Sequence, residues 1–424
     1  MGNDGFWYSV GMVLANRRAT KKAIKRINIE NAANKGIINY QPSQIEAFFD
    51  DREPLGNIII SGGDASIRSR AASRAIECAY IQGFSPVIIY GSDTVFENTL
   101  FSYFGRSNIA AVNMHTPLYE PLIGLTNTEI TRLIMQSAEK GFEIQGKGRY
   151  YINGISDFIK ARGITPYMHM YITCPYLSLI DKVNDAEIRG VISHNSARQI
   201  ISELTQGDAE RGNVENFFAS LDGQSGQLFS NKSNLPQAFN INLIVKNHGI
   251  FAVDVNSSVS TILLNILAYE IESLLAAGKK IFLCIDNLQL ERDSKLCSLL
   301  AKSGSTCAAM VVSDDVYASF GGEDSLFYST VGKSTKVVIS KHASAYSCQK
   351  WSDVIGSYDK KEISNSITGS YSIFGKFVAG TAHSTNINIK RESIIRPEEI
   401  SRMRCEEVFI LNGTTGELAH TTIV

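Results

Sequence analysis

The chain has 424 residues, of which 44% are hydrophobic and 20% charged, and its formal net charge at pH 7 is −1. This composition predicts a globular protein long enough for two or three domains, and the small net charge excludes a global positive field that would recruit nucleic acid. Its seven cysteines are scattered, without a C-x-x-C pair, which predicts reduced thiols, a cytoplasmic location and no metal site.

The first predicted element is the apolar run FWYSVGMVLA at residues 6–15. It is too short to span a membrane, and its positive charges follow it, unlike those of a secretory signal. We interpret it as a strand that leads into a solvated helix face. Against Asp4 and Glu30, six cations give the first thirty residues a charge of +4: Arg17, Arg18, Lys21, Lys22, Lys25 and Arg26. The alternative is a patch that faces anionic lipid or DNA.

Strands and helices then alternate. A short apolar strand at 58–60 precedes a helical pattern over 69–83, and further apolar strands are predicted at 86–90 and 108–114. Strand–helix–strand order favours a mostly parallel sheet covered by helices on both faces, which is an α/β fold.

The pattern becomes helical between about residues 116 and 236, with capping residues and terminal glycines, and includes a Gly/Ser/Asn-rich segment over 220–236 that we predict to be a loop. Sheet-like segments resume afterwards, at 248–256, 279–287, 307–315, 335–341 and 406–413. The expected division is a lead-in segment (1–56), a sheet domain (57–115 plus 237–424) and an inserted all-α domain (116–236).

The stretch NIIISGGDASIRSRAAS places a strand, two glycines and a helix where a phosphate loop would lie. In the motif G-x-x-x-x-G-K-[ST], backbone N–H groups surround the phosphates, the Lys contacts them and the hydroxyl binds Mg²⁺. Gly62 and Ser69 match the two ends, and Gly63 adds flexibility. Ile67 and Arg68 occupy the Gly and Lys positions, and a guanidinium fork does not simply replace an ammonium. Weak nucleotide or anion binding and a loop without any ligand both remain open.

An acid at the end of a buried strand would complete such a site by ordering Mg²⁺, and KKIFLCIDN supplies Asp286. The next residue is Asn287 instead of a glutamate, and an amide cannot act as a general base. Alternatively, Asp286 caps the helix that follows. The cofactor-binding residues that we predict are thus Gly62, Gly63, Arg68, Ser69 and Asp286, with no catalytic residue among them. A second match, GKST at 332–335, enters a strand and is predicted to be a turn.

Several segments recur in the order and spacing of a known family: LANRRATKKAIKRI, NIIISGGDASIRSR, PVIIYGSD, VNMHTPLYEPLIGLTNTEITRLIMQSAEKG, KKIFLCIDNLQLERDSKLCSLLAKSGSTCAAMVVSDD, STKVVISKHASAYSCQKWSDVIG and RESIIRPEEISRMRCEEVFIL. Together they resemble the cytosolic part of type IV secretion and conjugation coupling proteins. These are the TraG/TraD-like members of the FtsK/HerA group of RecA-like ATPases. The resemblance runs from about residue 15 to the C-terminus, and it implies a RecA-like sheet with an inserted all-α domain.

The departures from the family pattern fall on its catalytic positions. The loop has Ile67-Arg68, Asn287 replaces the water-activating Glu, Ser313 replaces a sensor Gln, and Gly304 aligns with an Arg that acts between subunits. The resemblance therefore implies a pseudo-ATPase that requires no cofactor, or one that binds ATP and Mg²⁺ without turnover.

By the same resemblance, such a protein acts as an adaptor or structural subunit. It recruits secretion-system subunits or substrate proteins through the helical insertion, in a homo- or hetero-hexamer. The family's N-terminal membrane helices are missing, so peripheral association with the inner face of the cell membrane is an open expectation, as is DNA contact. The rival hypothesis is an active hexameric ATPase that pumps DNA or protein. A third is a nucleic-acid-binding module that uses the basic N-terminal segment.

Overall fold

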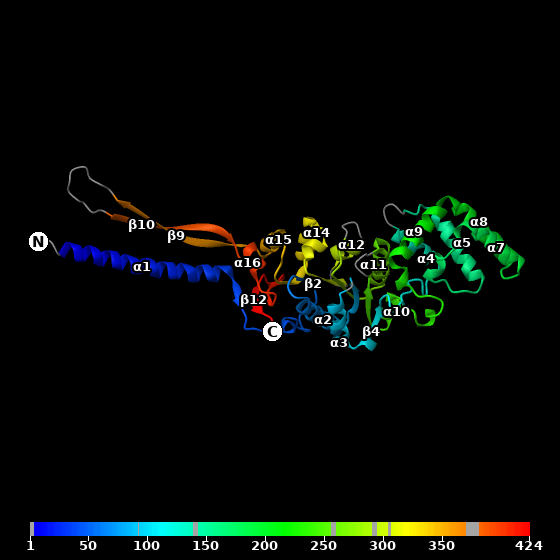
Figure 1. The fold of residues 1–424 in the computed structure, drawn as a ribbon, viewed down its shortest axis with the longest axis horizontal. Helices are drawn as coiled ribbons and strands as arrows, with labels where there is room; N and C mark the ends of the chain where they lie inside the picture. Colours follow the sequence, from blue (N-terminus) through cyan, green and yellow to red (C-terminus); the bar gives the residue numbers. More distant parts are fainter. Residues whose placement is uncertain are drawn as a thin grey trace.

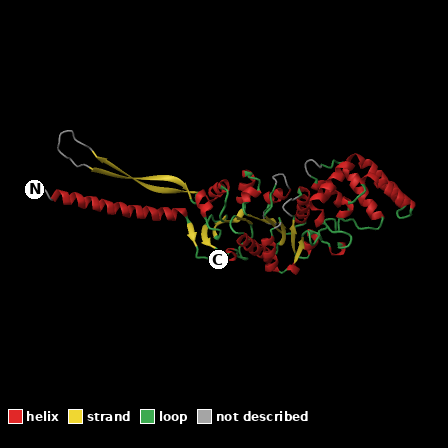
Figure 2. Cartoon of the chain, in the orientation of Figure 1, coloured by secondary structure: helices red, strands yellow, loops and turns green. Residues whose placement is uncertain are grey.

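The computed structural model describes residues 4–424 apart from 92, 139–142, 256–259, 291–294, 304–306 and 370–380. A sheet with helices on its faces forms the middle of an elongated molecule (Figure 1). A cluster of helices extends from one end of this layer. A long helix and a two-stranded hairpin project from the other (Figure 2).

Among the described residues, ten strands form the main sheet, in the order β1-β12-β11-β8-β2-β7-β6-β3-β5-β4. The run from β8 to β4 is entirely parallel, whereas β11 is antiparallel to both β8 and β12. The strands are β1 (Ile37–Asn39), β2 (Asn57–Ser61), β3 (Ser85–Tyr90), β4 (Ile109–Val112), β5 (Ile250–Asp254), β6 (Ile281–Asp286), β7 (Cys307–Ser313), β8 (Ser334–Ile339), β11 (Glu407–Asn412) and β12 (Leu418–Thr422).

The central strands are buried on both faces, which is why they read as continuous apolar runs. Ile59 packs into the core on one face of the sheet, and its neighbours Ile58 and Ile60 pack into the core on the other. The second face is covered by α2 (Ala65–Ile81) and α3 (Thr94–Phe104). The first is covered by α11 (Thr261–Ala276), α12 (Lys295–Lys302), α14 (Asp324–Val331) and α15 (Ala345–Ile355). The predicted α/β sheet is confirmed.

Helices occupy the chain between β4 and β5, and most of them gather beyond the β4 edge of the sheet (Figure 1). They are α4 (Asn127–Ser137), α5 (Gly148–Ala161), α6 (Met168–Ile172), α7 (Leu179–Ile188), α8 (His194–Gly207), α9 (Arg211–Ser225) and α10 (Ile241–Lys246). The loop predicted over 220–236 is wrong at its start, because α9 continues to Ser225. Leu221 and Ser225 are buried there, and this packing outweighs the helix-weakening Gly223.

The strand predicted over residues 6–15 is also wrong, because these residues belong to the long helix α1 (Asp4–Lys35). Helix α1 runs beside a hairpin formed by β9 (Ser357–Gly369) and β10 (Thr381–Ser393), and it contacts β9 (Figure 1). Ile27 of α1 is buried, whereas Ile24 and Ile29 are exposed. Among the described residues, no helix has the length and apolar character needed to cross a bilayer.

Two short helices complete the connections: α13 (Val316–Ser319) after β7, and α16 (Pro397–Arg402) after the hairpin. The GKST segment ends α14 at Gly332 and enters β8 at Ser334. It does not precede a helix, so it lacks the context of a phosphate loop.

Candidate functional site

The turn between β2 and α2 contains only Gly62, Gly63 and Asp64. Both glycines have positive φ, +84° and +74°, which only glycine adopts readily. The Asp64 side chain accepts a hydrogen bond from the N–H of Ser66 and caps α2. In a phosphate loop, about four residues between the two motif glycines surround the phosphate. Here the helix already begins at Ala65, so only Gly63 and Asp64 of the four residues between Gly62 and Ile67 lie in the turn.

The glycines are also needed because another part of the chain lies against them. A Cβ atom on Gly62 would be 2.6 Å from Cε1 of His342, and one on Gly63 would be 2.5 Å from Oγ of Ser340. Both neighbours belong to the segment that follows β8. Close packing against this segment therefore accounts for two glycines that the sequence suggested for phosphate binding.

The same packing engages the N–H groups of the turn. The N–H of Gly63 donates to the carbonyl oxygen of Lys341 at 2.9 Å, and the N–H of Gly62 donates to that of Ser313 at 3.1 Å. A phosphate would need N–H groups that point toward it. These two are already satisfied inside the protein.

The cation and the hydroxyl of the loop have internal partners as well. Nη1 of Arg68 donates to the carbonyl oxygen of Gly63 at 2.7 Å and lies 3.4 Å from that of Gly62. Oγ of Ser69 donates to the carbonyl oxygen of Ala65 at 2.7 Å, and Ser69 is buried. The two groups that would contact phosphate and Mg²⁺ therefore stabilise the turn itself.

Asp286 is the last residue of β6. It therefore lies at the carboxyl ends of the parallel strands, where the turn after β2 also lies. It is 3% exposed, and its Oδ2 has no hydrogen-bond partner. Burial, together with the nearby carboxylates of Asp93 and Asp314, raises its pKa to about 8, although the charge of Arg68 opposes this shift. The helix-cap interpretation of Asp286 is wrong, because the residues directly after it are not helical.

A buried histidine, which the sequence did not single out, lies beneath the turn. Nδ1 of His342 lies 2.8 Å from the carbonyl oxygen of Ser340, so Nδ1 is the protonated nitrogen. Nε2 then accepts from Nε1 of Trp351 at 3.0 Å and from Oγ of Ser61 at 2.8 Å. Oγ of Ser61 in turn accepts from the N–H of Val316. Burial lowers the pKa of His342, so the ring is neutral and joins β2 to the elements around it.

This Ser–His pair has the spacing of a nucleophile and its base, but not their setting. Ser61 and His342 are 1% and 2% exposed, so no substrate reaches them. Nδ1 of His342 faces a carbonyl instead of a carboxylate that would stabilise an imidazolium. We therefore assign Ser61 and His342 a structural role, in which their hydrogen bonds hold β2 against the segment that follows β8.

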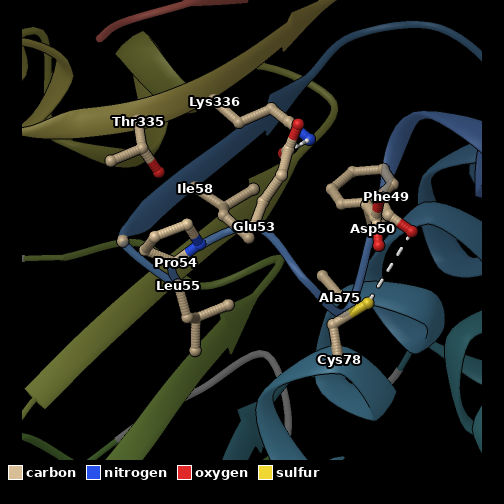
Figure 3. Close-up of a pocket in the computed structure, with 11 residues that line it drawn as sticks. Phe49, Asp50, Glu53, Pro54, Leu55, Ile58, Ala75, Cys78, Thr335 and Lys336 are labelled. Carbon is tan, nitrogen blue, oxygen red and sulfur yellow. Dashed lines mark hydrogen bonds and ion pairs between the residues drawn. The ribbon is translucent and has the colours of Figure 1, made fainter. Parts of the chain in front are cut away.

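Two further observations concern possible ligand sites. Within the described residues, no group of three or more His, Cys, Asp or Glu side chains could hold a metal ion. The hollow drawn in Figure 3 lies at the opposite end of β2, between Ile58, Ala75 and Thr335. Its volume of about 30 Å³ is close to that of one water molecule.

Comparison with known proteins identifies the fold. No family model and no curated protein matches the sequence. Among solved structures, the unbound bacterial conjugative coupling protein TrwBdeltaN70 matches with a TM-score of 0.55 and 13% identity, over 90% of each chain. This chain has the coupling-protein fold. TrwB with the GTP analogue GDPNP matches with a TM-score of 0.52 and 12% identity, over 89% of this chain and 91% of that one. TrwB with ADP and Mg²⁺ gives 0.51 and 12%, over 90% and 88%.

Within the coupling-protein fold, the remaining departures named from the sequence have structural roles. Asn287 has a φ of +52°, a conformation that asparagine tolerates better than most residues, and its N–H donates to the carbonyl oxygen of Val312. Ser313 is buried, and its hydroxyl bonds with that of Ser319 at 2.7 Å. Gly304 lies outside the described residues.

The five predicted site residues therefore all lie at the carboxyl ends of the parallel strands. Gly62 and Gly63 are in the turn, and Arg68 and Ser69 are near the start of α2. Asp286 is on β6, separated from β2 by β7. The sequence missed the segment around His342, which occupies the position next to the turn. No spacing rule connects Ser61 with His342, because they are 281 residues apart.

Proposed function

We propose that this chain is a non-catalytic component of a type IV secretion or conjugative transfer system, acting as an adaptor or structural subunit. The observation that carries the proposal comes from the segment between β2 and α2 in a coupling-protein fold. The N–H groups of Gly62 and Gly63, the guanidinium of Arg68 and the hydroxyl of Ser69 are all bonded to the protein itself. Hydrolysis needs these groups on the phosphates and on Mg²⁺. It also needs a base to orient water, and Asn287 cannot be one.

The direct test is a titration of the full chain with fluorescent ATP, with and without Mg²⁺, followed by a phosphate-release assay on the same sample. We expect no saturable binding at millimolar nucleotide and no release. Saturable binding without release would make the nucleotide a structural ligand. Release that Arg68→Ala abolishes would contradict the proposal.

One observation favours the rival hypothesis of an active hexameric ATPase that pumps DNA or protein. Oδ2 of Asp286 is buried without a partner at the strand end where an Mg²⁺-ordering acid would lie. A solved structure of TrwB is a complex with ADP and Mg²⁺. An ATPase of this kind loses activity with either Arg68→Ala or Asp286→Ala. A structural subunit keeps its partners with both variants.

The helical region between β4 and β5, which we treat as an inserted recognition domain over about residues 116–236, is the proposed binding surface for substrate proteins or sister subunits. Four apolar side chains are exposed around α7, at the end of the molecule far from α1 (Figure 1): Leu177, Ile180, Ile188 and Val191. We propose that these exposed apolar side chains contribute to a protein contact.

Deleting residues 116–236 should abolish the capture of secretion-system proteins in pull-downs. The sharper variant is Leu177→Asp with Ile188→Asp, which leaves the core intact. Ile81→Asp is its control, because Ile81 is similarly exposed but lies on α2. If the deletion variant still captures these proteins as the wild type does, the proposal that this region is the binding surface is wrong.

The basic half of α1 supplies a further contact in the proposed assembly. Arg18, Lys21, Lys22 and Lys25 are exposed on this helix, and an exposed cationic helix attracts anionic lipid or DNA. Peripheral attachment at the inner face of the cell membrane would appear as flotation with phosphatidylserine vesicles, reversed by substitution of these four residues. Binding to DNA instead, with a steep loss in salt, would support the nucleic-acid alternative.

A further inference from the structure

A cavity of about 270 Å³ lies where the helical region meets the sheet domain, between α4, α10 and α11. Leu133 of α4 and Leu125, just before α4, form part of its wall. Tyr269 and Leu274 of α11 form another part. Small-molecule sites are typically mostly apolar hollows of roughly 300–1,000 Å³ with a few convergent polar groups, so this cavity is slightly smaller than that range.

One wall of the cavity is held in place by a buried acid. Glu270 of α11 is 7% exposed, and its carboxylate accepts a hydrogen bond from the hydroxyl of Tyr119 at 2.5 Å. The backbone N–H groups of Ile241 and Asn242, at the start of α10, also bond to it. These bonds join three separate segments around the cavity, so its shape does not depend on a ligand to form it.

Among the described residues, the lining includes the polar residues Asn240, Asn242, Glu270 and Ser273, and its one cationic residue is at the rim. Lys246 is the last residue of α10, lines the cavity and is exposed. Within the part of the chain that the structure describes, no carboxylate pairs with its ammonium group. An ammonium group next to an apolar hollow is complementary to a molecule that carries one anionic group on an apolar body.

We propose that this cavity is a binding site for a small amphipathic anion. The apolar body lies against Leu125, Leu133 and Tyr269, and the anionic group pairs with Lys246. Such a molecule contacts the entry to the helical region and two helices that adjoin the sheet, so its binding strengthens their contact. The proposal is independent of any role in secretion.

The test uses two probes with the same naphthyl-phenylamine body and the full-length protein. 8-Anilinonaphthalene-1-sulfonate carries a sulfonate, whereas N-phenyl-1-naphthylamine is uncharged. We expect both to bind at one site per chain. Lys246→Gln should weaken the sulfonate roughly tenfold, as expected for loss of a charge-assisted bond, and change the uncharged probe less than about twofold. Lys279→Gln is the control, because Lys279 is exposed near the end of α11 but does not line the cavity.

Ser273→Trp fills the cavity from an exposed position on α11 and should weaken both probes at least about tenfold. Ala277→Leu fills it from one turn further along and is used if the first variant does not fold. The proposal is overturned if neither probe binds at one site per chain, if a folded filling variant binds them like the wild type, or if Lys246→Gln and Lys279→Gln behave alike.

Discussion

The guanidinium of Arg68 lies 2.7 Å from the carbonyl oxygen of Gly63, five residues before it in the chain. This cation, near the start of α2, is thus bonded to the turn that precedes the helix. Arg68→Ala should lower the free energy of unfolding by about 1–2 kcal/mol, because it leaves these carbonyl groups without their donor. Urea denaturation measures the change. Arg198→Ala, at an exposed position on α8, is the control. Equal stability of the two variants would mean that the Arg68 bond contributes nothing.

Gly62 offers a second prediction with a close internal control. Its φ is +84°, and an added Cβ would be 2.6 Å from His342. Gly83 has a nearly equal φ of +80°, but a Cβ there would have nothing within 4 Å. Gly83→Ala should cost about 1–2 kcal/mol of stability, from the backbone conformation alone. Gly62→Ala should cost about 1–3 kcal/mol more, from overpacking. If thermal and urea unfolding show the same loss of stability for Gly62→Ala and Gly83→Ala, the segment after β8 shifts to make room for the added methyl group.

The raised pKa of Asp286 predicts a dependence of stability on pH. Its pKa is about 8 in the folded protein, against an ordinary value of 3.8, so the folded state binds the proton more tightly than the unfolded state does. The contribution to stability is therefore fully present below about pH 4 and is lost as the pH rises to 8. Asp286→Asn mimics the protonated acid. Its stability relative to the wild type should increase between pH 6 and pH 9, by on the order of a few kcal/mol.

Urea denaturation of the two proteins at each pH gives this difference directly, and other titrating groups cancel in the comparison. Asp181→Asn, at an exposed position on α7, is the control and should show a constant difference. If the Asp286→Asn difference were also constant, the carboxylate would be charged in the fold and balanced by a cation.

The sheet was predictable from the sequence because strands that are buried on both faces appear as short, continuous apolar runs. Runs such as residues 58–60 are apolar throughout, and each is followed by a helix or a turn residue. Helix α1 and the β9–β10 hairpin lack such a pattern of burial in their sequences. In the part of the chain that the structure describes, the hairpin pairs with no other strand, and residues such as Ile387 and Ile389 are exposed. Its pattern therefore follows no single buried face.

The candidate site was predictable only in part. Motif spacing located Gly62 and Arg68, because a strand, a turn and a helix are local features. What these residues contact depends on His342 and Ser340, which approach only when β8 pairs with β2. Long-range packing of this kind leaves no signal in the spacing of a single sequence. The sequence therefore indicated where a phosphate site would be. Only the three-dimensional structure shows that the segment after β8 packs against this turn.

Asn31 connects α1 to the hairpin and gives the last prediction. Its side chain donates to the carbonyl oxygen of Lys361 and accepts from the N–H of Lys361, both at 2.8 Å, as a neighbouring strand would at the edge of β9. Asn31→Ala should increase the hydrogen-exchange rate of the Lys361 amide roughly tenfold, because two bonds that hold this edge are lost. Asn34→Ala is the control, since Asn34 makes a single 3.5 Å contact with Asp359. Unchanged exchange at Lys361 would show that α1 does not protect the hairpin edge.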